Sequence, residues 1–93
     1  MTVLLITYDL NKPEQDYPEL LNIIKSHDYF FVSKSSYLVD VVDPSKLWEK
    51  ISTVIDESTR LCMFPVERST IVRVFPESSE TKKFDDWLHA RIH

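Results

Sequence analysis

The first candidate for chemistry is a carboxylate at the end of an apolar segment. Thr2–Leu10 is hydrophobic at both alternating sets of positions, and its only charged residue is Asp9. This pattern predicts a central strand covered on both faces, with Asp9 at the mouth of the sheet. A carboxylate there can take part in catalysis, or it can cap a turn by accepting a hydrogen bond from the amide of Asn11 or Lys12. The turn cap is the commoner use of an acid at a strand end.

The histidines and the cysteine are the other candidate ligands and nucleophiles. His89 and His93 are spaced i, i+4, which suits a transition-metal pair, but no third ligand is evident. His27 falls where a helix is expected to end, and there the helix dipole favours a positive charge in any case. Cys62 is the only cysteine, so the sequence has no disulfide framework. Within its β-prone run, Cys62 is expected to be a small buried hydrophobe.

Aromatic side chains offer a further kind of chemistry, the stacking of nucleic-acid bases. Tyr8, Phe30, Phe31 and Tyr37 fall on predicted strands, and aromatic rings on a sheet face stack on bases in some RNA-binding proteins. Helices must cover one face of this sheet, however, so we expect at least half of these rings to belong to the core. Stacking without basic neighbours is a weak basis for binding nucleic acid.

Composition limits the cofactors and partners. The net charge is −4, and the 11 Lys and Arg residues are scattered, which disfavours general nucleic-acid binding. The sequence has no glycine, and this excludes glycine-rich phosphate loops and the dinucleotide fingerprint. We therefore expect no cofactor. Because neither a signal sequence nor a long apolar run is evident, we expect a cytoplasmic protein without membrane contact.

Apolar periodicity and turn residues predict a β-α-β-β-α-β order. The first helix is expected to start at an Asp16/Glu19 capping box and to end near His27, and the second starts at Asp43-Pro44. The predicted strands are Thr2–Leu10, Tyr29–Val32, Ser36–Val42 and Leu61–Val66, and the stripe of the second helix is Leu47, Trp48, Ile51, Val54 and Ile55. This order predicts a ferredoxin-like α+β sandwich with an antiparallel sheet.

Two further elements are predicted after this unit. Thr70–Phe75 reads as a fifth strand, and Glu80–Ile92 reads as a short helix with Phe84, Trp87 and Leu88 facing inward. We expect its acids, Asp85 and Asp86, to be solvated. A fifth strand after a complete sandwich can pair with an exposed strand edge, including that of a second subunit. Residues 1–93 are expected to form one domain.

Several segments of the chain resemble a known family. The predicted order, with a first strand ending in Ile6-Thr7-Tyr8-Asp9, resembles the small CRISPR adaptation subunit family, Cas-two. The chain is more closely similar to the SinR-family proteins of bacteria and phages, which are relatives of Cas-two. The shared segments, within residues 2–66, are Tyr8-Asp9-Leu10-Asn11-Lys12-Pro13, Gln15-Asp16-Tyr17, Ser36-Tyr37-Leu38-Val39 and Asp56-Glu57-x-x-Arg60-Leu61.

The resemblance implies a symmetric homodimer with Asp9 of each subunit near the two-fold axis. In the Cas-two family this pair is treated either as a metal-dependent nuclease site or as part of a structural adaptor. Two Asp9 carboxylates could share one Mg²⁺, which prefers oxygen ligands and lowers the pKa of a bound water. The chain departs from Cas-two in its acidic balance and in having no Arg-rich stretch after Asp9, and both departures weaken a nucleic-acid role.

Three functions therefore compete. The leading hypothesis is a non-enzymatic, homodimeric binding or assembly protein, encoded by a phage or mobile element, that acts on a host macromolecule through a protein partner. The alternative is a Mg²⁺-dependent endoribonuclease or deoxyribonuclease in which Asp9 of each protomer is the catalytic and metal-binding residue, and Tyr8 or Lys12 positions the phosphate. The third is a small regulatory ligand-binding domain, since this fold hosts many functions.

Overall fold

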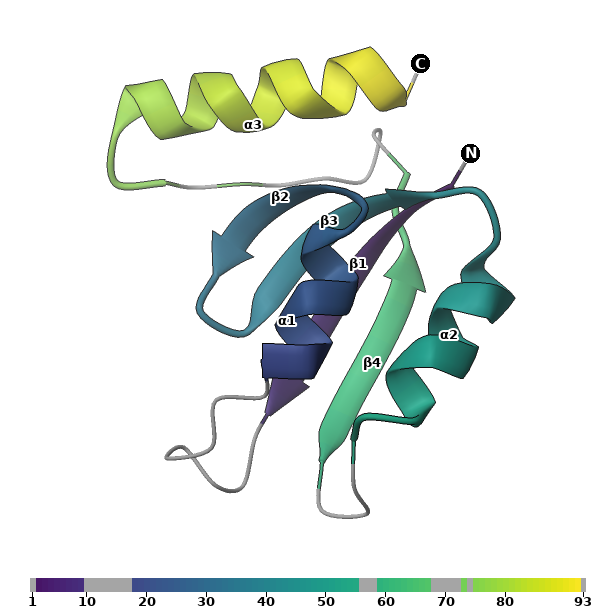
Figure 1. Cartoon of the computed structure of the whole chain (residues 1–93). Helices are drawn as coiled ribbons and strands as arrows, with labels where there is room; N and C mark the ends of the chain where they lie inside the picture. The colour runs from purple at the N-terminus through teal and green to yellow at the C-terminus, as the bar shows by residue number, and fades with distance from the viewer. Residues whose placement is uncertain (1, 10–17, 56–58, 68–72, 74, 93) are drawn as a thin grey trace.

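The computed structural model describes residues 2–9, 18–55, 59–67, 73 and 75–92 (Figure 1). The elements are β1 (Thr2–Asp9), α1 (Pro18–Lys25), β2 (Asp28–Ser33), β3 (Ser36–Val41), α2 (Pro44–Ser52), β4 (Arg60–Pro65) and α3 (Ser78–Arg91). The chain is therefore a mixed α+β structure, as predicted. No described helix is long and apolar enough to cross a membrane.

The strands form one antiparallel sheet in the order β2-β3-β1-β4. The central position predicted for the first strand is confirmed, because β1 pairs with β3 on one side and β4 on the other. The Tyr8 amide donates to the Ser35 carbonyl at 3.0 Å, and the Val66 amide donates to the Val3 carbonyl at 3.0 Å. Since hydrogen-bonded pairs alternate along antiparallel strands, even residues of β1 bond to β3 and odd residues bond to β4.

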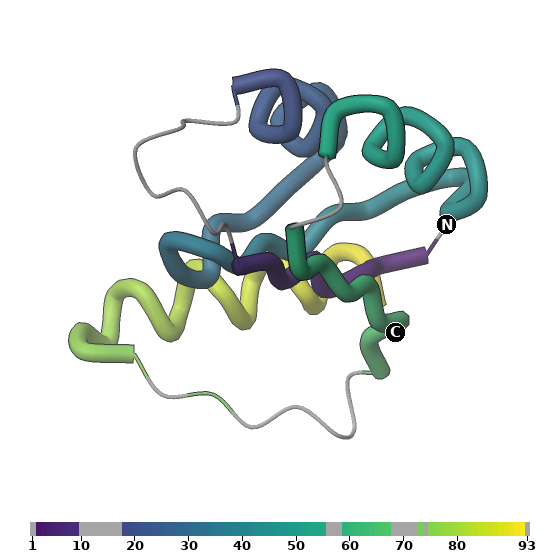
Figure 2. Tube along the Cα trace, turned by 90° about the horizontal axis from the view of Figure 1, so that it is seen from below, coloured from purple at the N-terminus to yellow at the C-terminus, as the bar shows by residue number. Residues whose placement is uncertain are grey.

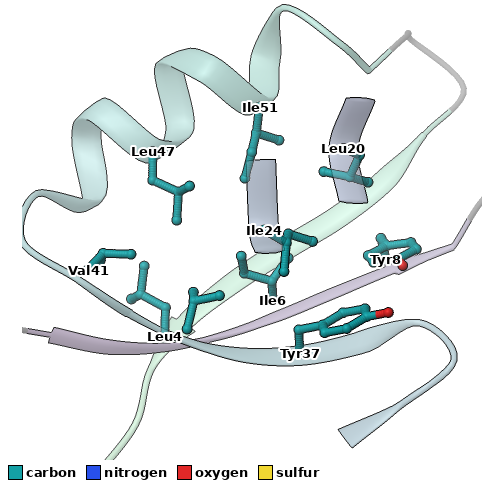
Figure 3. Close-up of a cluster of buried hydrophobic side chains, with 10 residues drawn as sticks. Leu4, Ile6, Tyr8, Leu20, Ile24, Tyr37, Val41, Leu47 and Ile51 are labelled. Atoms are coloured by element: carbon teal, nitrogen blue, oxygen red, sulfur yellow. The ribbon is translucent and has the colours of Figure 1, made fainter. Parts of the chain in front are cut away.

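One face of the sheet carries the larger core. Helices α1 and α2 lie on this face, and Figure 3 shows side chains from both helices pointing toward the strands. Leu20 and Ile24 of α1 and Ile51 of α2 are fully buried. The buried members from the sheet and from the start of α2 are Leu4, Ile6, Tyr8, Tyr37, Val39, Val41 and Leu47. The even residues of β1 therefore face these two helices.

Helix α3 lies against the opposite face, so the molecule has three layers (Figure 2). Phe84 and Leu88 are its buried residues, and they pack against Val3 and Leu38 of the sheet. The Phe84 ring meets the Phe30 ring edge-on, with centroids 5.6 Å apart. This second core explains why β1 is apolar on both alternating sets of positions.

Polar contacts also attach α3 to the start of β2. Asp28 accepts two hydrogen bonds from the Arg91 guanidinium, one of them at 2.7 Å, and a third from the Trp87 indole at 3.2 Å. The Arg91 guanidinium lies over the Trp87 ring, 4.2 Å from its centroid. This group, Asp28, Trp87 and Arg91, is called the α3 clasp below.

The helix boundaries show where local chemistry overrides periodicity. Asp43 caps α2 as predicted, because its carboxylate accepts from the amides of Ser45 and Lys46 at 3.0 and 3.4 Å. The helix ends at Ser52, before the predicted Val54 and Ile55. Ser52 and Thr53 hydroxyls donate to the Glu49 and Lys50 carbonyls at 2.8 and 2.7 Å. Such side-chain bonds compete with the helical ladder and favour its termination.

Two predictions fall wholly or largely outside the described residues. The Asp16/Glu19 capping box cannot be compared, because Asp16 lies outside them. Of the predicted fifth strand, Thr70–Phe75, only Arg73 and Phe75 are described, and neither belongs to a strand. The predicted final helix is present, although α3 begins two positions earlier, at Ser78.

Candidate functional site

The C-terminal end of β1 places Asp9 at the rim of the sheet. Its side chain is exposed, and it follows the buried residue Tyr8. Two contacts tie this end of β1 to the β2–β3 hairpin: the Tyr8 hydroxyl donates to the Lys34 carbonyl at 3.4 Å, and the Ser36 hydroxyl donates to Thr7 at 3.2 Å. The strand end is therefore held in place while the carboxylate remains accessible to solvent.

Arg60 is the cross-strand partner of Asp9. The two Cα atoms are opposite each other in the β1–β4 register, and alternation from the Val3–Val66 pair makes them a hydrogen-bonded pair, with Cα atoms about 5.5 Å apart. Opposite charges on facing residues of a sheet attract each other, although the described side chains of Asp9 and Arg60 form no ion pair. The Arg60 guanidinium would also repel a divalent cation placed there. The sequence did not predict that Arg60 faces Asp9. The signal for this neighbour was the pair of opposite charges at the ends of the two predicted strands.

The described residues form no cluster of three or more His, Cys, Asp or Glu side chains able to hold a metal ion. His89 is exposed on α3, and its predicted partner His93 lies outside the described residues. Lys12, which was expected to help position a phosphate beside Asp9, lies outside them as well. Asp9 is thus the one carboxylate at this end of β1 that the structure describes.

Asp9 lies on the same face of the sheet as α3, and residues of β4 on this face are exposed. We call Leu5, Thr7, Cys62 and Phe64 the β4 surface, since Leu5 opposes Phe64 and Thr7 opposes Cys62 in the register. Phe64 is 52% exposed. Helix α3 buries its apolar residues against Val3 and Leu38 and packs against Phe30 of β2, and among the described residues Cys62 and Phe64 of β4 remain exposed.

Two predictions of burial are wrong. Cys62 is exposed, because the buried residues of α3 lie over Val3 and Leu38 and not over this part of β4. Trp48 was expected to pack on the stripe of its helix, but it is 46% exposed, while Leu47 and Ile51 of the same helix are buried. The buried side of α2 is thus narrower than its hydrophobic positions suggest, and the Trp48 indole lies outside it.

The aromatic residues divide as expected between core and surface. Tyr8 and Tyr37 are 8% and 6% exposed, so their faces are unavailable for stacking. Phe30 packs against Phe84, and Trp87 packs as predicted with the second core. Phe31 is 53% exposed, with its ring edge-on to Tyr37. Of the four strand aromatics considered for base stacking, Phe31 alone is exposed.

Burial alters the acid–base chemistry of Tyr8. Its phenol loses hydration in the core, and this raises its pKa above the ordinary value of 10.0; the neighbouring Tyr37 adds to the rise. A phenol that holds its proton more tightly is a weaker acid and remains neutral at physiological pH. Tyr8 therefore serves as a core residue and as a donor to the Lys34 carbonyl.

Comparisons of the chain with protein-family models, with curated proteins and with solved structures find no match.

Proposed function

We propose that the chain is a non-enzymatic, homodimeric binding protein whose two copies join along β4. One observation carries the proposal: β4 ends the described sheet, and its edge lies beside the exposed Phe64. The strand order β2-β3-β1-β4, with α1 and α2 on one face, supports a ferredoxin-like assignment. The SinR-like resemblance of residues 2–66 also implies a symmetric dimer, but one with Asp9 near the two-fold axis, so it supports dimer formation and not the β4 contact itself.

The backbone of β4 has hydrogen-bonding groups available for a partner strand. Because Val66 bonds to Val3, alternation directs the amides of Cys62 and Phe64 toward β1 and those of Leu61 and Met63 outward. No described residue pairs with this outer edge. Unpaired strand edges readily add a strand from another chain. Pro65, which has no amide hydrogen, limits the edge to a short segment and favours one register.

The side chains add an apolar contribution to the same contact. Burying apolar surface favours association, and the β4 surface contains Phe64 and the half-buried Leu5. In a two-fold symmetric dimer each copy would contribute Leu5 and Phe64 to the contact. The dimer would then present its acidic surface, at −4 per chain, to a basic region of a protein partner.

The mass in solution tests the dimer. We expect light scattering on a sizing column at tens of micromolar to give twice the 11.0 kDa of the chain. Phe64→Glu should shift the mass to that of a monomer, because it places a charge in the contact on both copies. Phe31→Glu is the matched control, since Phe31 is equally exposed, at 53%, on the other edge strand. A monomeric wild type, or a dimer broken only by Phe31→Glu, would contradict the proposal.

A Mg²⁺-dependent nuclease is the second candidate, and the exposed Asp9 at the end of the central strand favours it. It requires a different dimer. In a β4–β4 contact the two Asp9 residues are separated by three strand spacings, about 14 Å. Two carboxylates that far apart cannot both reach one ion whose oxygen ligands lie at about 2.1 Å. The two proposals therefore exclude each other.

Nuclease assays on RNA and DNA with Mg²⁺ or Mn²⁺ decide between them. Metal-dependent cleavage by the wild type that Asp9→Asn abolishes, while the mass remains that of a dimer, would establish the nuclease and reject the β4 contact. Arg60→Gln is an informative second variant. It removes the neighbouring cation, so it should increase metal affinity if Asp9 is a ligand.

A further inference from the structure

A pocket lies on the α1/α2 side of the molecule, on the opposite face from the β4 surface. It has a volume of about 250 Å³, and its lining includes His27, Val41, Val42, Lys46, Leu47 and Lys50. The sheet register brings these residues together: Asp28 pairs with Asp40, so the end of α1 meets the point where β3 leads into α2. Figure 3 shows Leu47 pointing from α2 toward the sheet near Val41.

The pocket combines an apolar floor with a positively charged rim. Val41 and Leu47 are each 2% exposed and form the floor. Lys46 and Lys50 are one helical turn apart on α2, and residues four apart lie on the same side of a helix. Neither lysine forms an ion pair with a described residue. Two lysines without a described counter-ion therefore lie beside an apolar surface.

His27 and Asp43 complete the polar lining. The Ile23 carbonyl, which can only accept, lies 2.9 Å from His27 Nδ1, so Nδ1 carries the proton and Nε2 remains for another partner. Asp43 is the only acid among the described residues of the lining. Its Oδ1 already accepts from two α2 amides. With two lysines against one engaged carboxylate, the charge of the lining is positive.

We propose that this pocket binds a small phosphate monoester. A phosphate dianion matches two ammonium groups in charge, and its oxygens can accept from both. The organic part would contact Val41, Val42 and Leu47. Val42 is 81% exposed, so a bound molecule would cover an apolar side chain that now faces water. The pocket is slightly smaller than the range of about 300–1,000 Å³ for drug-sized ligands, which limits the ligand to a phosphate with a short organic group.

Amide chemical-shift titrations of the full chain at constant ionic strength test this assignment, with phenyl phosphate, inorganic phosphate and benzoate as probes. We expect phenyl phosphate to shift the amides of residues 27, 41–43 and 45–50 and to bind more tightly than either other probe, because only it supplies both the dianion and the ring. Benzoate binding as tightly would overturn the choice of phosphate. Shifts scattered over lysines elsewhere, or absent at millimolar concentrations, would overturn the site.

Variants that remove a positive or a negative charge from the lining should change the affinity in opposite directions, which makes the test specific. Lys46→Gln and Lys50→Gln should each weaken phenyl phosphate binding about fivefold. Asp43→Asn should strengthen it by a similar factor, because Asn caps a helix as well as Asp but carries no charge. Lys83→Gln, on α3, is the control and should change nothing. The proposal fails if Lys83→Gln weakens binding as much as Lys50→Gln, or if Asp43→Asn weakens it.

Discussion

At the scale of single residues, local hydrogen bonds could be predicted from the sequence, whereas burial could not. Asp43 was predicted as a helix cap, and its carboxylate accepts two α2 amides. This succeeded because capping depends on residues two and three positions away. Burial is different. Cys62 and Trp48 have the composition of core residues, but whether they are covered depends on where distant elements pack, which local sequence does not contain.

Tyr8 provides a prediction at this scale. Its folded-state pKa is raised by burial, so its contribution to the free energy of unfolding is fully present below the unfolded value of about 10 and is lost as pH rises through the folded pKa. As the pH rises above about 10, the wild type should therefore lose more of its free energy of unfolding than Tyr8→Phe does. Urea unfolding at each pH measures this. Tyr29→Phe, at a residue 38% exposed, is the control, and identical curves for wild type and Tyr8→Phe would refute the prediction.

At the scale of elements, α3 depends on fewer contacts than the strands it covers. It buries Phe84 and Leu88, whereas β1 buries Val3, Leu4, Ile6 and Tyr8. The α3 clasp supplements this small apolar contact, and the Arg91 side chain is only 20% exposed. The strands and helices could be predicted because the repeat of hydrophobic residues that marks each one lies within a short segment of sequence. The face that α3 covers could not, since the clasp joins Asp28 to residues about sixty positions away.

The clasp leads to a second prediction. Arg91→Ala should lower the free energy of unfolding by about 1–2 kcal/mol, because it removes charge-assisted bonds to Asp28 and the packing of the guanidinium on Trp87. Lys82→Ala is the matched control. It removes an i, i+4 pair with Asp86 whose side chains are 80% and 68% exposed, and it should cost no more than about 0.5 kcal/mol. Equal costs in urea unfolding would mean that the clasp adds nothing beyond an ordinary surface pair.

Arg91→Ala should also act locally. Amide hydrogen exchange is expected to speed up throughout α3 while β1 and β3 remain protected, because regions with few buried contacts open before the rest of the fold. Exchange that accelerates equally in β1 would show instead that α3 and the sheet unfold as one cooperative unit. Mass spectrometry of peptides from Ser78–Arg91 and Thr2–Asp9 distinguishes the two outcomes.

At the scale of the whole molecule, the central strand contributes residues to both cores and to the β4 surface. Its two-sided hydrophobicity correctly predicted a central strand. The β4 surface and the phosphate pocket could not be predicted in the same way. Each combines residues from separate elements, Leu5 with Phe64 in one case and His27 with Lys46 in the other, so both depend on register and on the angle at which helices cross the sheet.

The proposed dimer makes a thermodynamic prediction at this scale. Association that occurs only in the folded state stabilises that state by mass action. The thermal midpoint of unfolding should therefore rise with protein concentration, and it should not rise for Phe64→Glu. Scanning calorimetry over a hundredfold range of concentration, a span sufficient for mass action to be resolved, measures this. A midpoint of the wild type that is independent of concentration would count against the β4 contact.

The position of α3 after every strand also matters while the chain is being made. The ribosome releases β1–β4 before Phe84 and Leu88 emerge. Until then Val3, Leu38 and Phe30 form an uncovered apolar layer on a sheet that already has its other two helices. A nascent chain in this state is a substrate for chaperones that bind hydrophobic surface, and any pause in translation between β4 and α3 would prolong its exposure to aggregation.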